Sequence, residues 1–121
     1  MGTITSKLGE RTPVKTFPSE EKWKEYFESS KSSDKLLVVD FHAKWCPPCQ
    51  YIAPKFKELA AQHKDVDFVK IDVDAFKDVA EGFQVTAMPT FIFFKGGKEL
   101  DRLLGADEDE LKKKIDQLKK K

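Results

Sequence analysis

The chain has 121 residues, of which 40% are apolar, and its 22 basic and 21 acidic residues leave a net charge of +1 at pH 7. This length suits one domain with an ordinary core, and the near-neutral charge argues against bulk electrostatic attraction to nucleic acid. No run approaches the roughly 18 apolar residues of a membrane-spanning helix, and no apolar segment typical of a secretory signal is visible.

Residues 1–12 are expected to form a flexible leader ahead of a folded domain at residues 13–121. Met1-Gly2-Thr3-Ile4-Thr5-Ser6 matches the N-myristoylation pattern, with Gly2 as the acceptor once Met1 is removed. One acyl chain would give only weak, reversible membrane contact, because no cysteine lies near Gly2 to hold a second one. The alternative is an unmodified, frayed chain end.

The next segments predict a short strand and an amphipathic helix. The alternation at Val14–Phe17 is typical of a strand, and Ser19 is suited to cap a helix that ends near Ser30. Aromatic residues then recur at the spacing of one helical face, and we expect them to form a buried stripe: Trp23, Tyr26 and Phe27.

An apolar run at Leu36–Phe41 predicts a strand buried on both faces, and a helix follows to about His63. Pro54 lies inside this helix, where it is expected to bend the axis. The remaining chain predicts strands at 66–72, 90–95 and 99–104, helices at 76–83 and from 107 onward, and a glycine-containing hairpin turn at 95–98. This order predicts an α/β fold with parallel strands joined by helices and one antiparallel hairpin.

The chain contains two cysteines, Cys46 and Cys49, where the buried strand turns into a helix. Two cysteines are too few for the disulfide scaffold of a small secreted protein, so we expect a cytosolic protein. Unpaired backbone N–H groups and the helix dipole favour a thiolate at Cys46. A thiolate attacks disulfides, and a second thiol nearby can release the product. The pattern therefore predicts redox chemistry.

Pro47 and Pro48 lack backbone N–H groups, so the first helical turn offers Cys46 fewer hydrogen-bond donors than usual. The nearest remaining donors are the amides of Cys49 and Gln50. We expect Cys46 to be exposed at the helix start and Cys49 to lie one turn deeper.

Three polar residues interrupt the apolar strands. Asp40 follows four apolar residues, where burial would raise its pKa, but a surface charge at a strand end fits the sequence equally well. His42 shares a strand face with Asp40, either as an ordinary half-exposed residue or as a group that tunes the pH dependence. Lys70 breaks a second apolar run, as a lysine on the polar side of a strand would.

Six segments at characteristic spacing, within about residues 13–118, resemble the thioredoxin family. They are Val39-Asp40-Phe41, Trp45-Cys46-Pro47-Pro48-Cys49, Ile52-Ala53-Pro54, Asp72-Val73-Asp74, Ala87-Met88-Pro89-Thr90-Phe91 and Gly105-Ala106. The Cys-Pro-Pro-Cys variant is most similar to plant cytosolic h-type thioredoxins. Two residues depart from the family's usual pattern: His42 stands where an aromatic or small residue is common, and Pro47 where glycine is commonest.

This resemblance implies a thioredoxin-like fold, with a central mixed five-stranded sheet flanked by four helices. It implies that Cys46 is the nucleophile, Cys49 the resolving thiol and Asp40 a buried acid that takes the proton from Cys49. Lys70 matches a lysine near that acid, with an electrostatic role. A cis-proline loop and its neighbours would form an apolar surface for the extended backbone of a substrate: Trp45, Ala87, Met88, Pro89, Gly105 and Ala106.

The activity that the resemblance implies is protein-disulfide reduction, with a reversible Cys46–Cys49 dithiol/disulfide pair. Members of the family need no bound cofactor or metal. Electrons would come from NADPH through a flavin-containing thioredoxin reductase, so the implied partners are that reductase and disulfide-containing target proteins, with no nucleic acid.

Three alternatives remain open at this point. The same chemistry run backwards would make the protein a disulfide oxidase or isomerase. Cys46 and Cys49 with His63, and His42 as a fourth ligand, would resemble half of a zinc site, although two prolines between the cysteines give poor geometry for it. A binding or chaperone surface independent of redox chemistry would survive Cys46→Ser.

Overall fold

The computed structural model describes residues 13–121, so the expected leader and the expected acylation of Gly2 lie outside the described residues. Within this range four helices and five strands follow one another. They are β1 (Val14–Lys15), α2 (Glu20–Ser30), β2 (Leu37–His42), α3 (Pro47–Gln62), β3 (Asp67–Asp72), α4 (Lys77–Gly82), β4 (Thr90–Lys95), β5 (Lys98–Leu104) and α5 (Glu108–Leu118).

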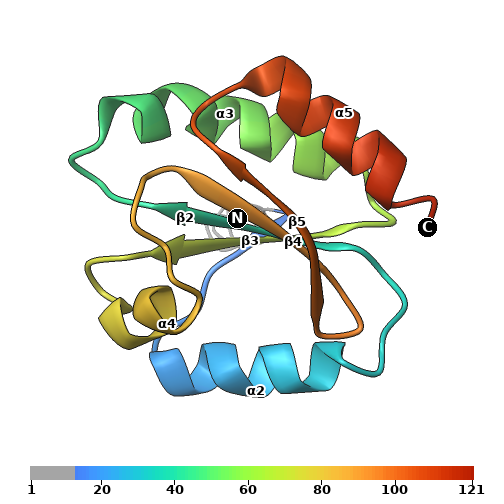
Figure 1. Ribbon diagram of the computed structural model, residues 1–121, viewed down its shortest axis with the longest axis horizontal. Coiled ribbons are helices and arrows are strands. Elements are labelled where there is room, and N and C mark those ends of the chain that lie inside the picture. Colours follow the sequence, from blue (N-terminus) through green and yellow to red (C-terminus); the bar gives the residue numbers. More distant parts are fainter. Residues whose placement is uncertain (1–12) are drawn as a thin grey trace, which may run out of the picture.

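The strands form one mixed sheet in the order β1-β3-β2-β4-β5. β1, β3 and β2 run parallel, whereas β4 is antiparallel to both β2 and β5. Helices α3 and α5 cover one face of the sheet, and α2 and α4 cover the other (Figure 1). The predicted mixed five-stranded sheet with four flanking helices is confirmed.

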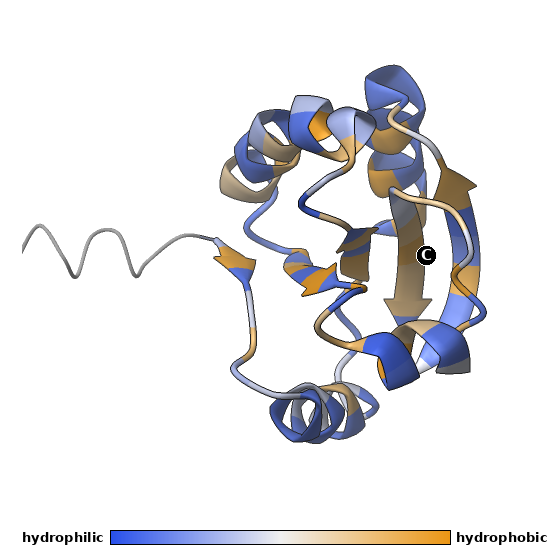
Figure 2. Ribbon diagram, turned by 90° about the vertical axis from the view of Figure 1, so that its left-hand side faces the viewer, coloured by the Kyte–Doolittle hydropathy of each residue, from blue (hydrophilic) through white to orange (hydrophobic). Residues whose placement is uncertain are grey.

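Successive residues of β2 enter two different cores because side chains alternate along a strand. Val38 packs in a cluster with residues of α3 and α5, and Val39 packs in a second cluster with residues of α2 and α4. Figure 2 shows the apolar residues of the strands between the two helical layers. Of the predicted stripe, Trp23 is buried in the second cluster, whereas Tyr26 and Phe27 pack against that cluster and are only partly buried.

Local signals in the sequence explain where several elements begin and turn. The Ser19 hydroxyl accepts a hydrogen bond from the Lys22 amide at 3.2 Å, which caps α2. Asp107 caps α5 through the Glu110 amide at 3.1 Å. The β4–β5 turn needs positive φ at two positions, which Gly96 and Gly97 supply at 60° and 82°.

Strand boundaries differ from the sequence prediction in four strands, and two of the differences are shifts of one residue, since β3 begins at Asp67 and β5 at Lys98. β2 begins at Leu37 and reaches His42, because His42 still pairs with Asp72 of β3. The strand predicted at Val14–Phe17 is limited to its first two residues, which are the ones paired with β3. Helix α3 is continuous through Pro54. Among the described residues, none of the helices is long and apolar enough to cross a membrane.

Candidate active site

Cys46 is the N-cap residue of α3, and its backbone is extended at φ −93° and ψ 112°. Its Sγ accepts a hydrogen bond from the backbone N–H of Cys49 at 3.3 Å, as predicted. The other predicted donor was wrong: the Gln50 amide bonds to the Cys46 carbonyl oxygen at 3.1 Å, as an ordinary helical amide does. Because Pro47 and Pro48 have no N–H, one backbone amide serves the sulfur.

Both cysteines are free thiols and both are buried. The expectation that Cys46 is exposed was wrong, since only 3% of its surface is accessible. Ala43, Val73 and Met88 pack around the two side chains, and the Cys46 thiol lies 3.6 Å from the Met88 carbonyl oxygen. The loop that contains Met88 therefore covers the sulfur from a distant part of the sequence.

The environment of Cys49 favours its neutral thiol. Burial, the hydrogen bond with Cys46 and the negative charge of Asp40 together raise the pKa of Cys49 to about 12. Cys49 therefore needs a proton acceptor before its sulfur can attack another sulfur.

Asp40 lies in the middle of β2 with 1% of its surface accessible, which decides between the two alternatives for this residue in favour of burial. Neither carboxyl oxygen has a hydrogen-bond partner within residues 13–121. Burial raises the pKa of Asp40 to about 7, although the positive charge of Lys70 opposes the rise. A buried carboxyl group with a pKa near neutrality can accept and release a proton under physiological conditions.

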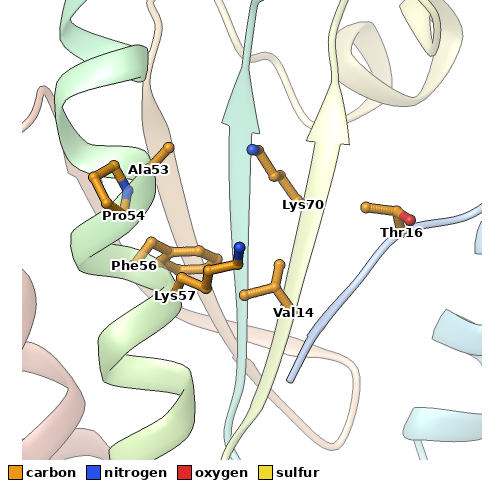
Figure 3. A pocket seen from close by; sticks show the side chains of 7 residues that line it. All are labelled: Val14, Thr16, Ala53, Pro54, Phe56, Lys57 and Lys70. Carbon is orange, nitrogen blue, oxygen red and sulfur yellow. The ribbon is translucent and has the colours of Figure 1, made fainter. Parts of the chain in front are cut away.

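Lys70 of β3 is the register partner of Asp40 in the parallel β2–β3 pair, so both side chains lie on the face of the sheet that α3 covers. Its side chain is at the edge of two surface cavities, of about 490 Å³ and 220 Å³. Figure 3 shows Lys70 in the larger one, pointing from β3 toward Ala53 of α3. The structure thus brings Lys70 close to the buried acid, as the resemblance implied.

The predicted substrate surface surrounds a cis peptide bond between Met88 and Pro89. The Thr90 hydroxyl donates to the Ala87 carbonyl at 2.6 Å, and the Gly105 amide donates to the Pro89 carbonyl at 2.9 Å. Gly105 has φ +98°, a conformation that other residues rarely adopt. These bonds hold the proline loop against the segment after β5.

Trp45 is the most exposed large apolar residue of the described chain, at 64%. Its indole N–H donates to a carboxylate oxygen of Asp74 at 2.8 Å, and this bond fixes the ring beside the cysteines. Asp74 had not been assigned a role in the site from the sequence, although it lies in one of the segments that carry the resemblance. Leu104, 59% exposed and directly before Gly105, had also been missed.

The zinc alternative is inconsistent with the position of His63. The cysteines are at the start of α3 and His63 is the C-cap of the same 16-residue helix, about 24 Å away at 1.5 Å per residue. His63 instead lies beside α5, with its Nδ1 3.0 Å from the Lys119 amine. Within residues 13–121 no group of three or more His, Cys, Asp or Glu side chains could hold a metal ion.

Comparisons with known proteins agree with this geometry. The thioredoxin family model matches residues 14–117. Thioredoxin H2 of Arabidopsis thaliana is 51% identical over 117 residues, covering 97% of this chain and 88% of that protein. Thioredoxin H2-1 of rice is 45% identical over 111 residues, covering 92% and 80%.

Solved structures of plant thioredoxins have the same fold. The crystal structure of thioredoxin NaTrxh from Nicotiana alata superposes with a TM-score of 0.86 at 51% identity, covering 88% of this chain and 92% of that one. The poplar thioredoxin h PtTrxh4 superposes with a TM-score of 0.82 at 34% identity, covering 88% and 96%. The similarity to h-type proteins inferred from Cys-Pro-Pro-Cys is thus confirmed, and the chain belongs to the thioredoxin family of thiol–disulfide oxidoreductases, which act as protein-disulfide reductases.

Proposed function

We propose that Cys46 is the nucleophile and Cys49 the resolving thiol of this reductase. The Cys46 thiolate attacks a target disulfide: one S–S bond breaks, a mixed disulfide with Cys46 forms, and the other target sulfur leaves as a thiolate. Cys49 then loses its proton and attacks the Cys46 sulfur, which releases the second target thiolate. Two electrons pass to the target, and the protein is left with a Cys46–Cys49 disulfide.

Asp40 is the base for the second step. Support comes from its burial, its unpartnered oxygens and its pKa, which burial raises from 3.8 to about 7 and which makes it a stronger base than an ordinary carboxylate. Mixed-disulfide formation removes the thiolate of Cys46 and with it the hydrogen bond and charge that oppose ionisation of Cys49. Lys70 has an electrostatic role in the same pair, since its charge favours the carboxylate of Asp40.

Targets bind as extended chains on the apolar surface beside the cysteines, which consists of Trp45, Ala87, Met88, Pro89, Gly105 and Ala106. Pro89 immediately precedes β4, which begins at Thr90. Because proline has no backbone N–H, another strand of the protein does not pair with the loop there and compete with a target chain, which supports this proposal. Electrons reach the Cys46–Cys49 disulfide from NADPH through a thioredoxin reductase, without a cofactor bound to this chain. The protein acts in the cytosol.

The observation on which the assignment depends is the difference between the two thiols. Cys46 Sγ accepts an amide hydrogen bond at a helix start, whereas Cys49 has a strongly raised pKa and donates its own backbone N–H to Cys46. A pair of serine variants tests the assignment by reduction of insulin disulfides. Cys46→Ser should abolish both reduction and adduct formation, whereas Cys49→Ser should accumulate a mixed disulfide with its target. Accumulation in Cys46→Ser instead would reverse the two roles.

The oxidase or isomerase alternative is tested by the reduction potential of the pair. Equilibration with a thiol–disulfide buffer should give a strongly reducing value, and an oxidising value would favour the reverse reaction. Reduction that persists in Cys46→Ser would instead indicate that the activity does not depend on this cysteine pair.

A further inference from the structure

Beside Cys49 lies a surface cavity of about 220 Å³ that the reaction as described so far does not use. The end of β2, the loop after it, the first turns of α3 and one residue of β3 form its walls. The lining residues are His42, Ala43, Lys44, Cys49, Gln50, Ala53 and Lys70. The cavity therefore joins the resolving thiol to the molecular surface.

The proposed reaction leaves a proton on a group that has almost no contact with solvent. Asp40 is 1% exposed, and its neighbours across the sheet are Phe91 of β4 and Lys70 of β3. Neither of its oxygens has a hydrogen-bond partner within the described chain that could pass the proton on. For Asp40 to act as a base again, the proton that it took from Cys49 must leave through another group.

His42 is placed to provide that exit. It lies two residues after Asp40 on β2, so both side chains lie on the face of the sheet that α3 covers. It is half-buried, unlike Asp40, and it shares the cavity with Cys49. An imidazole ring accepts a proton at one nitrogen and can release another from the second.

Burial and nearby positive charges favour the neutral form of the His42 ring. Burial lowers the pKa of His42, and the positive charges of Lys70 on β3 and Lys44 in the following loop lower it further, against the opposing effect of Asp72 on β3. Of the cavity-lining residues, the two lysines are ammonium groups without a lone pair for a proton. The neutral imidazole of His42 has a lone pair that can accept a proton.

We propose that His42 transfers the proton of the Asp40–Cys49 pair to solvent through this cavity, and returns one when the disulfide is reduced again. The inference rests on the proposed function, because it needs Asp40 as the base. Because Asp40 has no hydrogen-bond partner within the described chain, the proton moves from the Cys49 thiol to the Asp40 carboxylate, then by way of water to the His42 imidazole and out to solvent, with no change in electron count. His42 makes no hydrogen bond to either reacting sulfur within the described chain, so it acts through Asp40.

The test separates the two thiol steps with a chromogenic aromatic disulfide, 5,5′-dithiobis(2-nitrobenzoate). Attack by Cys46 releases one coloured thiolate, and attack by Cys49 on the mixed disulfide releases the second. Reduced protein is held at about pH 5, well below the pKa of about 7 of Asp40, or at about pH 8, and is then mixed with excess reagent at about pH 8. From the acidic start, Asp40 must lose a proton before it can accept one from Cys49.

We expect wild-type protein to release the second thiolate at the same rate whether it was held at the acidic or at the alkaline pH before mixing. His42→Gln should slow the second release several-fold from the acidic start alone, and added imidazole should restore it. This effect is smaller than the roughly 10²-fold or greater contribution of a base that contacts the reacting group. The first release should not change, because Cys46 is not the source of this proton.

The matched control is His63→Gln, which removes the other histidine of the chain at the far end of α3. It should behave as wild type from both starts. The inference would be overturned if His42→Gln released the second thiolate at the same rate after both holding pH values. A slower release that imidazole does not restore would also overturn it, because it would indicate that His42 has a packing role. Loss of the first release in wild-type protein would refute the proposed function instead.

Discussion

Both faces of the sheet bury apolar clusters, but the face toward α3 and α5 also buries a carboxyl group. Toward α2 and α4, the odd-numbered residues of β2 enter a cluster of aliphatic and aromatic side chains. Phe27, Phe83 and Phe94 meet there with ring centroids 5.0 to 5.7 Å apart. Toward α3 and α5, the even-numbered residues of β2 include Asp40, whose carboxyl group has no hydrogen-bond partner in the described chain.

This difference separates stability from chemistry within one small domain. An apolar cluster stabilises the fold by removing hydrophobic surface from water, whereas a buried, unpartnered carboxyl group costs free energy. On the α3 face this cost arises at Asp40, whose raised pKa suits it to exchange a proton with Cys49. Substitutions on the two faces should therefore have opposite effects on stability and activity.

The largest loss of stability is expected on the aromatic face, at Trp23. Trp23→Ala removes a buried ring that packs on Phe17, Tyr26, Phe27 and Phe83 and should lower the free energy of unfolding by about 3–5 kcal/mol. Denaturant unfolding measures this loss. The reduction potential of the folded fraction should not change, and Tyr51→Ala, at an exposed aromatic residue, is the control for stability.

The α3 face should make stability depend on pH. In the folded chain the pKa of Asp40 is raised from 3.8 to about 7, so the folded state binds the proton more tightly. Stability is therefore greatest below about pH 4 with respect to this group and falls by about 4 kcal/mol as the pH rises through 7. Denaturant melts at several pH values measure the slope, which Asp40→Asn should remove. If the free energy of unfolding depends on pH in the same way in wild type and in Asp40→Asn, Asp40 is not the group that causes this dependence.

Asp40→Asn should also show that the acid serves the chemistry rather than the fold. The amide cannot accept the Cys49 proton, so release of the second thiolate should slow by about 10²-fold while the first release remains as in wild type. Rapid mixing with the chromogenic disulfide measures both steps. An unchanged second release would eliminate Asp40 as the base, and a slowed first release would indicate a wider disturbance of the site.

The smallest effect, a change in reduction potential, is expected at Pro47, which is exposed at the start of α3. Pro47→Gly restores a backbone N–H in the first turn of α3, where one amide now serves the Cys46 sulfur. A better-solvated thiolate stabilises the dithiol, so the reduction potential should become less negative, by up to about 30 mV, or 1.4 kcal/mol. Pro48→Ala, which introduces a backbone N–H at the neighbouring position, is measured alongside it. A potential that stays constant in Pro47→Gly would contradict the argument from amide donors.

Much of this architecture follows from local patterns. The spacing of Trp23 with its neighbours predicted a buried helical face, and Gly96 with Gly97 predicted the hairpin turn. The position of Cys46 between an apolar strand and a helix predicted the N-cap geometry. Each of these signals acts within a few residues of the chain, where sequence and structure are tightly linked.

Contacts between distant segments account for what the sequence alone did not predict. Cys46 is buried because Met88 and Val73 lie over it, and nothing near Cys46 indicates that cover. The pairing of Lys70 with Asp40 depends on the register of β2 with β3, which the resemblance implied but the alternation of residues does not determine. Asp74 acquires its role through an indole that lies 29 positions earlier.

The bonds of Cys46 to Met88 and of Trp45 to Asp74 span 42 and 29 residues of chain. These contacts join segments from different parts of the sheet, so they contribute to a high contact order. No isolated hairpin or helix contains a working site. Reductase turnover followed through a thermal melt should therefore decline together with the folded fraction, and early loss of turnover would reveal partial opening of the loop at Met88.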